Sequence, residues 1–178
     1  GDITLAGTLT LPEGDGPHPA VVLITGSGGQ DRDETILSMR PFKLIADGLT
    51  PAGIAVLRYD DRGIGQSTGD FASATTSDFA TDAAAAIDYL LTRDDINPEQ
   101  IGVLGHSEGG IVSAMLGATN PHLAFIISMA GTSVNGRDVL TLQNELILRA
   151  SGASEEVIAL QLEFLPRMYD AVEAGDRD

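Results

Sequence analysis

Ser107 is the residue whose neighbours most strongly suggest nucleophilic chemistry. It is the centre of the pattern Gly105-x-Ser107-x-Gly109. The apolar run 101–105 predicts a short buried strand, and the stretch 108–118 predicts a helix. A serine at a tight turn between strand and helix has a strained backbone, so the residues two positions away must be small. In this context the pattern indicates a nucleophile rather than a serine in an ordinary solvated turn.

The chemistry that such a turn supports is acyl transfer. The turn lifts the hydroxyl of Ser107 beyond the C-terminal edge of the sheet. The N-terminus of the following helix offers unpaired N–H groups and the positive end of its dipole to a developing oxyanion.

The elements that must position Ser107 alternate along the chain. Strands are predicted over 3–11, 20–25, 54–60, 101–105 and 124–129, and helices over 35–50, 77–92 (with Ser77 or Asp78 as N-cap) and 108–118. Strands that alternate with single helices imply a parallel sheet covered on both faces. The first stretch alternates around Gly7 and ends at Pro12, as an antiparallel hairpin or a bent edge strand would. We therefore expect an α/β fold with a mostly parallel sheet, opened by an antiparallel N-terminal hairpin.

The pattern changes towards the C-terminus. Two helical stretches, 137–150 and 154–173, follow without a strand between them, and Pro166 interrupts the second. The apolar residues of the second stretch spread around much of the helix, which indicates a helical cap that covers a site. The alternative is an ordinary kinked core helix. We expect an incomplete α/β core over 1–133 and an incomplete cap or lid over 134–178.

The composition restricts the possible functions. The chain has 178 residues, 43% hydrophobic and 20% charged, which is enough for one globular core of ordinary size. The net charge of −16, with Lys43 as the single lysine, argues against nucleic acid or an anionic membrane surface as a partner. No apolar run has the length of a transmembrane helix, so we expect a soluble protein, either cytoplasmic or exported.

Metal and cofactor chemistry find no support in the sequence. The absence of cysteine excludes disulfides, thiol catalysis and thiolate metal sites. The carboxylates are too scattered to specify a metal site, and the segment GSGGQ is too short and badly spaced for a phosphate-binding or dinucleotide-binding loop. We expect neither a metal nor a cofactor.

Three stretches together resemble the α/β-hydrolase superfamily. GHSEGG after a strand resembles the nucleophile elbow, YDDRGIGQS at 59–67 resembles the D-x-R-G-x-G-x-S loop of many of these enzymes, and ITGSGGQDRDE at 24–34 lies where their oxyanion-hole loop follows its strand. The likeness covers nearly the whole chain. It is strongest to bacterial carboxylesterases near the dienelactone-hydrolase and prolyl-oligopeptidase-like branches.

The resemblance implies roles for particular residues. Ser107 would be the acyl-accepting nucleophile, and the backbone N–H groups of Glu108 and Ser27 would hold the oxyanion. Ser27 follows the place where the family usually has His-Gly and this chain has Thr25-Gly26. The side chain of Glu108 would need to do no chemistry.

Charged residues crowd the two loops that carry the resemblance. They could bind a polar group of the substrate, but we favour the pinning of the loops through arginine–carboxylate hydrogen bonds. The residues are Asp31, Arg32, Asp33, Glu34, Asp61 and Arg62.

A serine nucleophile also needs a base, and in this fold an acid and then a histidine follow the serine along the chain. The sequence has three histidines. His18 precedes the first buried strand, His122 is expected at the edge of the sheet opposite Ser107, and His106 is expected to point to the other side of the turn. Because the chain also begins within a predicted strand, we expect a fragment whose acid and base come from the rest of its own chain or from a second chain.

These observations predict a serine hydrolase that cleaves small carboxylic esters through an acyl-enzyme at Ser107. An aminopeptidase or an acyl-thioester hydrolase on the same fold is the enzymatic alternative. A catalytically dead, hydrolase-like binding module is the alternative without catalysis.

Overall fold

The structure, a computed structural model, describes residues 3–175. The chain divides into two compact units, Gly1–Gly131 and Thr132–Asp178. The division falls two residues before the boundary expected between core and cap.

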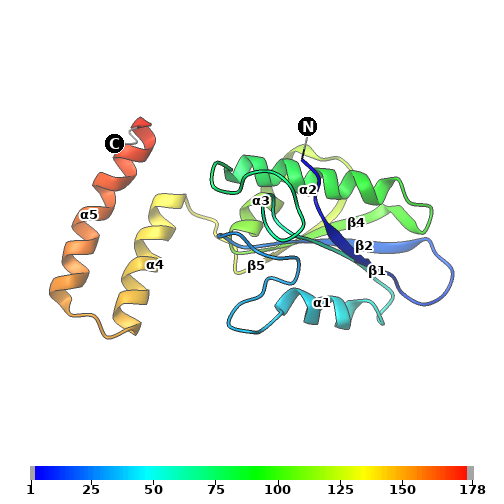
Figure 1. The fold of residues 1–178 in the computed structure, drawn as a ribbon, viewed down its shortest axis with the longest axis horizontal. Coiled ribbons are helices and arrows are strands. Elements are labelled where there is room, and N and C mark those ends of the chain that lie inside the picture. Colours follow the sequence, from blue (N-terminus) through cyan, green and yellow to red (C-terminus); the bar gives the residue numbers. More distant parts are fainter. Residues whose placement is uncertain (1–2, 176–178) are drawn as a thin grey trace. The chain divides into compact units, whose positions relative to one another are not determined.

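The first unit is built on a five-stranded sheet with the strand order β1-β3-β2-β4-β5 (Figure 1). Strands β2 to β5 are mutually parallel, and β1 is antiparallel to its neighbour. Figure 1 shows α1 on one face of the sheet and α2 and α3 on the other. This confirms the predicted mostly parallel α/β fold. The elements are β1 (Gly7–Thr10), β2 (His18–Ile24), α1 (Pro41–Leu49), β3 (Ala55–Tyr59), α2 (Thr76–Leu91), β4 (Ile96–His106), α3 (Glu108–Thr119) and β5 (Leu123–Met129).

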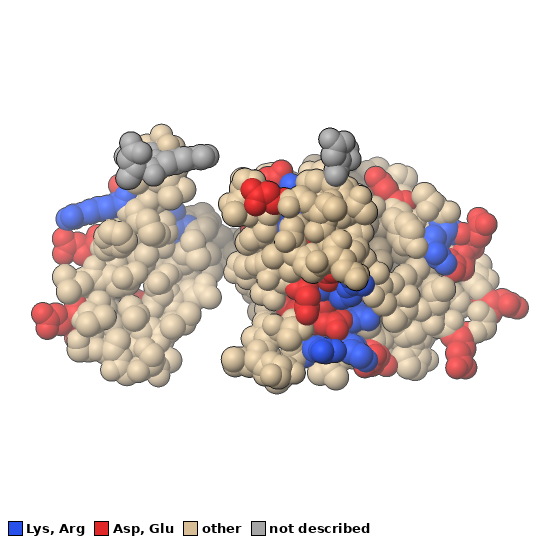
Figure 2. Space-filling model, viewed as in Figure 1, with Lys and Arg blue, Asp and Glu red and all other residues tan. Residues whose placement is uncertain are grey.

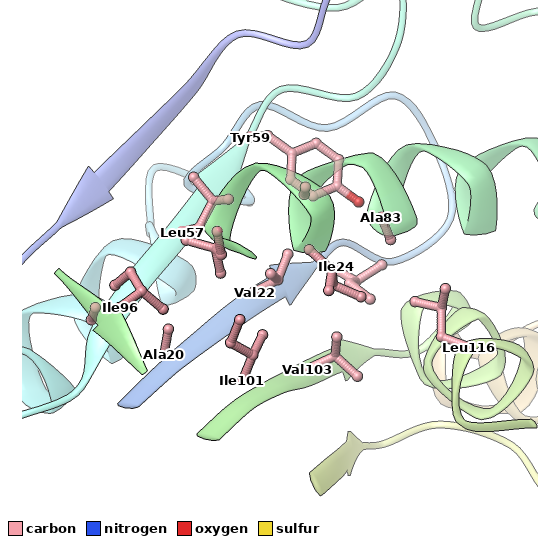
Figure 3. Close-up of a cluster of buried hydrophobic side chains, with 14 of the residues drawn as sticks. Ala20, Val22, Ile24, Leu57, Tyr59, Ala83, Ile96, Ile101, Val103 and Leu116 are labelled. Atoms are coloured by element: carbon pink, nitrogen blue, oxygen red, sulfur yellow. The ribbon is translucent and has the colours of Figure 1, made fainter. Parts of the chain in front are cut away.

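The central strand β2 is buried on both faces, which explains why its sequence is apolar without alternation. Ala20, Val22 and Ile24 pack towards α2 and α3 in the larger core cluster, part of which Figure 3 shows. Val21 and Leu23 pack on the other face with Phe42 and Ala46 of α1. The core therefore fixes the end of β2, from which the predicted oxyanion loop begins.

The predicted N-terminal hairpin is wrong. Strand β1 pairs with β3, from Gly7 opposite Tyr59 to Thr10 opposite Val56, and not with the next strand of the chain. The reason is topological: β2 has parallel partners on both sides, β3 and β4, so β1 cannot pair with β2 and joins the free edge of β3. The alternative expectation of an edge strand is confirmed.

Helix α1 is shorter than the predicted helix 35–50. Ile36 and Met39 exchange two backbone hydrogen bonds across a tight turn, and the residues between them, Leu37 and Ser38, have positive φ. Pro41 occupies the first turn of the helix. A residue before proline avoids the helical region, so the helix begins at the proline although an apolar stripe extends further back.

Two other boundaries also move. The N-cap of α2 is Thr75, not Ser77 or Asp78, and its N–H and hydroxyl both donate to the carboxylate of Asp78. Strand β4 begins at Ile96, before the predicted turn, and its pairing with β2 is irregular over this first part.

The second unit is a pair of helices, α4 (Gly136–Ala150) and α5 (Glu155–Ala174). Arg137 near the start of α4 pairs with Asp170 and Glu173 near the end of α5, at 2.6 and 3.1 Å, so the helices are antiparallel. Pro166 removes one main-chain hydrogen bond but does not interrupt α5, contrary to expectation.

Most large apolar side chains of this second unit are exposed, while Ile158, Leu165 and Tyr169 are buried. Among residues 3–175, no helix has the length and apolar character needed to cross a membrane.

Candidate active site

Ser107 lies between the last residue of β4 and the first residue of α3, with φ 51° and ψ −114°. Its N–H donates to the carbonyl of Met129, and its carbonyl accepts from the N–H of Gly110, both at 3.0 Å. Positive φ is uncommon outside glycine, and a residue held there costs about 1–3 kcal/mol, a strain that concentrates at functional sites. The structure therefore has the strained turn that the sequence predicts at this serine.

The two glycines of the pattern are required by close approach of backbones. A Cβ at Gly105 would overlap the carbonyl oxygen of Gly109, and a Cβ at Gly109 would overlap the carbonyl oxygen of Ile24. The first turn of α3 is thus packed directly against β4 and the end of β2.

The loop after β2 lies against the same turn. A Cβ at Gly26 would stand 3.2 Å from the Cβ of Ser107. The N–H of Gly26 donates to the Oε1 atom of Glu34 at 2.8 Å, so it is not available to a substrate. The N–H groups of Ser27 and Glu108, the predicted oxyanion donors, have no acceptor within residues 3–175.

The side chain of Glu108 is engaged elsewhere. Its Oε1 atom accepts a hydrogen bond from the hydroxyl of Thr76, in the first turn of α2, at 2.6 Å. The carboxylate is thus held by α2, and the role of the Glu108 N–H stays a prediction.

The charged residues of the two loops pair with one another. Arg32 donates through Nε and Nη2 to the two carboxylate oxygens of Asp60, at 2.9 and 2.7 Å, which holds the pKa of Asp60 down at about 2. Arg58 pairs with Asp33. On the face of the first unit drawn in Figure 2, basic groups lie against acidic ones. These contacts support the loop-pinning interpretation.

Arg62 is a third arginine with such a role, and it ties the loop after β3 to α2. Its Nε and Nη2 donate to the carboxylate of Asp82 at 2.7 and 2.8 Å, and Nη2 also donates to the carbonyl of Asp78 at 2.8 Å. Asp82 and the Arg62 side chain are nearly fully buried.

Asp61 holds the loop that follows β2. Its carboxylate accepts from the hydroxyl of Thr25 at 2.7 Å and from the N–H of Gln30 at 2.9 Å. Burial outweighs these hydrogen bonds and raises the pKa of Asp61 to about 6. A cavity of about 10 Å³, close to the volume that one water needs, is lined by Asp61, Thr25, Gly26, Glu108 and four apolar or aromatic neighbours.

None of the three histidines is placed to act on Ser107. His18 begins β2 and His122 immediately precedes β5, so both lie at the N-terminal ends of parallel strands, opposite the serine. The Nδ1 atom of His106 is 2.7 Å from the Oε1 atom of Glu34. The hydroxyl of Ser107 makes no hydrogen bond to any described residue, and residues 3–175 contain no group of three or more potential metal ligands.

Sequence reasoning missed the contacts of Glu34. Its partner His106 is 72 positions away in the sequence, and the two meet only because β2 and β4 are adjacent and parallel, so their C-terminal ends share one edge. No local pattern at Glu34 signals this pairing.

Comparisons with known proteins show the family and the fold of the chain. The family model described as X-Pro dipeptidyl-peptidase (S15 family) matches residues 1–177. Esterase EstD of Thermotoga maritima is 42% identical over 115 residues, which are 63% of this chain and 27% of that protein. The 2,6-dihydropseudooxynicotine hydrolase of Paenarthrobacter nicotinovorans is 32% identical over 125 residues, 70% of this chain and 31% of that protein.

The solved structures show the same fold. The α/β hydrolase GrgF from Penicillium sp. sh18 superposes with a TM-score of 0.63 at 23% identity, covering 98% of this chain and 64% of that one. The chain spans less than a third of the length of the two curated relatives above. By its sequence and its fold, the chain belongs to the X-Pro dipeptidyl-peptidase (S15) family and has the α/β-hydrolase fold.

Proposed function

We propose that this chain carries the nucleophile and the oxyanion hole of a serine hydrolase that cleaves small carboxylic esters. The observation that carries the proposal is the backbone of Ser107, held at positive φ where β4 turns into α3. The identity to an esterase, 42% over 115 residues, supports an ester as the substrate.

In the proposed reaction the Oγ atom of Ser107 attacks the carbonyl carbon of the ester and passes its proton to a base. The carbonyl π electrons move to the oxygen, and the resulting oxyanion accepts hydrogen bonds from the N–H groups of Ser27 and Glu108, for which the described part of the chain offers no other acceptor. Collapse of the intermediate breaks the bond to the alcohol, which leaves with the proton. Water then attacks the acyl carbon, releases the acid and restores the serine hydroxyl. These reaction steps need no metal or cofactor.

In the proposed mechanism, residues outside this amino-acid sequence supply the base and its acid partner. These residues belong either to the same protein or to a second chain. The positions of His18, His106 and His122 support this, since two lie at the opposite edge of the sheet and the third is bonded to Glu34. Helices α4 and α5 are assigned to a helical cap, supported by their many exposed apolar side chains.

A peptidase is the second candidate, favoured by the description of the family as an X-Pro dipeptidyl-peptidase. Acyl transfer from an amide or a thioester uses the same nucleophile and oxyanion hole, so the residues described do not separate the three substrates. A binding module without catalysis would have the same fold as these enzymes but would not carry out the reaction.

The deciding experiment compares substrates on the complete protein. Initial rates are measured with p-nitrophenyl butyrate, an acyl-thioester of the same chain length and an X-Pro p-nitroanilide, for the wild type and for Ser107→Ala. We expect kcat/KM to be highest for the aryl ester and to fall at least 10³-fold in Ser107→Ala, because removal of one triad member removes most of the catalysis. A higher kcat/KM on the anilide favours the peptidase, and equal activity of Ser107→Ala refutes the serine mechanism.

A further inference from the structure

Glu34 is a buried carboxylate that contacts both segments of the proposed oxyanion hole. Its side chain is about 1% exposed. One atom, Oε1, accepts the N–H of Gly26 at 2.8 Å and lies 2.7 Å from Nδ1 of His106. Gly26 directly precedes Ser27, and His106 directly precedes Ser107. A single oxygen atom thus links the two segments that carry the nucleophile and the oxyanion donors.

Stability alone does not account for this residue. Glu34 has φ 51°, in the left-handed region that most side chains avoid. Its second oxygen, Oε2, is buried and has no hydrogen-bond partner among residues 3–175. Both features are unfavourable, since a strained backbone and a buried polar atom without a partner each destabilise the folded state. A residue with such unfavourable features calls for an explanation in what its side chain does for the surrounding structure.

The space around Gly26 shows how closely these groups are packed. A Cβ added at Gly26 would lie 3.2 Å from Nδ1 of His106, 3.2 Å from the Cβ of Ser107 and 3.3 Å from Oε1 of Glu34. A small movement of the loop would therefore change the position of the Ser27 N–H relative to the serine.

We propose that Glu34 is a positioning residue for the oxyanion hole. Its Oε1 atom, bonded to Gly26 and His106, forms a clamp that holds the loop after β2 against the turn at Ser107, and so keeps the Ser27 and Glu108 N–H groups aimed at one point. The Glu34 clamp, as we call this set of contacts, rests on the proposed function of that site.

The geometry makes the clamp separable from the charge of Glu34. Because both bonds go to one oxygen, a glutamine can place its carbonyl oxygen there and its NH₂ group at the unpartnered Oε2 position. Glu34→Gln therefore keeps the clamp and removes the charge. Glu34→Ala removes both. Asparagine tolerates positive φ better than alanine does, but its side chain is one methylene shorter than that of glutamate, so Glu34→Asn also removes the clamp. It replaces Glu34→Ala in the test if the alanine variant fails to fold.

The test uses the complete protein, with Glu99→Ala as the matched control at an exposed carboxylate. Active sites are counted with a fluorophosphonate, and kcat and KM are measured on p-nitrophenyl butyrate. We expect Glu34→Ala and Glu34→Asn to lower kcat 10- to 100-fold with KM within 3-fold, because loss of an oxyanion donor lowers kcat by about 10²–10³ and a misplaced donor is a partial loss. Glu34→Gln and Glu99→Ala should stay within 5-fold of the wild type.

Deuterium exchange of residues 24–30 provides a readout that does not require activity. Exchange at the N–H of Gly26 should be at least tenfold faster in the alanine and asparagine variants than in the wild type, and close to wild type in Glu34→Gln. If the wild type cleaves no ester, the proposed function fails while the exchange still decides the clamp. Unchanged exchange, or unchanged kcat per titrated site with only a lower melting temperature, would overturn the positioning role. An equal loss of kcat in Glu34→Gln would show that charge matters and not the clamp.

Discussion

Alanine substitution at Gly105 and at Gly117 tests the packing of the nucleophile turn. Both residues leave no room for a Cβ, but the obstacle differs. At Gly105 the added atom would overlap the backbone of Gly109, whereas at Gly117 it would overlap the Cδ1 atom of Ile126. A backbone in the first turn of a helix cannot move without moving the helix, while the end of an isoleucine side chain can rotate.

The expected magnitudes follow from these obstacles. At Gly105, the overlap is removed only if the first turn of α3 moves away from β4. The free energy of unfolding should therefore fall by at least about 3 kcal/mol. At Gly117, within α3, alanine gains about 1 kcal/mol of helix propensity. Rotation of Ile126, which is 43% exposed, costs about 0.5–1.5 kcal/mol, so the net change should be within about 1 kcal/mol.

The assay is urea unfolding of the complete protein followed by circular dichroism, with ester hydrolysis measured on the same samples. Gly105→Ala should lose both stability and activity, because the shift that relieves the overlap displaces Ser107. Gly117→Ala should keep both. If the two variants differ in stability by less than about 1 kcal/mol and Gly105→Ala keeps its activity, the steric explanation of the G-x-S-x-G pattern is refuted for this chain.

Three further predictions concern the supports of the site. Burial raises the pKa of Asp61 to about 6, above the value near 3.9 of an unfolded aspartate, so the folded state binds the proton more tightly. The contribution of Asp61 to the free energy of unfolding should therefore fall by about 2 kcal/mol from pH 4 to pH 6. Urea titrations should show this fall in the wild type and not in Asp61→Asn; the same fall in both would exclude Asp61 as its source. Asp82→Asn leaves the buried guanidinium of Arg62 with the partly exposed carboxylate of Asp78, 3.3 Å away, as its remaining charged partner, and should cost about 2 kcal/mol. The exposed Asp88→Asn in the same helix should cost less than about 0.5 kcal/mol. Equal unfolding midpoints of these two variants would contradict a stabilising role for the pair. Thr75→Ala removes a hydroxyl at the N-cap of α2 and should lower the free energy of unfolding by about 1 kcal/mol. An unchanged midpoint of urea unfolding would show that this cap does not stabilise the protein.

The parts of the fold that depend on local sterics could be predicted from the sequence. The turn at Ser107 is encoded by the glycines on either side and by the switch from a strand to a helix pattern, so its residues and its conformation were both predicted. The succession of strands and helices, and the parallel sheet that it implies, was predicted for the same reason.

The parts that depend on distant partners could not be predicted. Strand β1 pairs with β3 because of the positions of other strands, which no residue in β1 encodes. The start of α1 was misplaced because Ile36 and Met39 fit a helical stripe although they belong to a turn before Pro41. Likewise, the acidic loop was predicted to be pinned, but the link from Glu34 to His106 depends on the pairing of β2 with β4.

The central claim is that Ser107 is the nucleophile, and covalent labelling tests it most directly. The complete, folded protein is incubated with a fluorophosphonate, and the adduct is located by peptide mass spectrometry, with Ser107→Ala and the exposed Ser77→Ala as a matched pair. We predict one adduct, on Ser107, that is lost in Ser107→Ala and retained in Ser77→Ala. An adduct on another serine, or ester hydrolysis by a protein that carries no adduct on Ser107, would contradict the account.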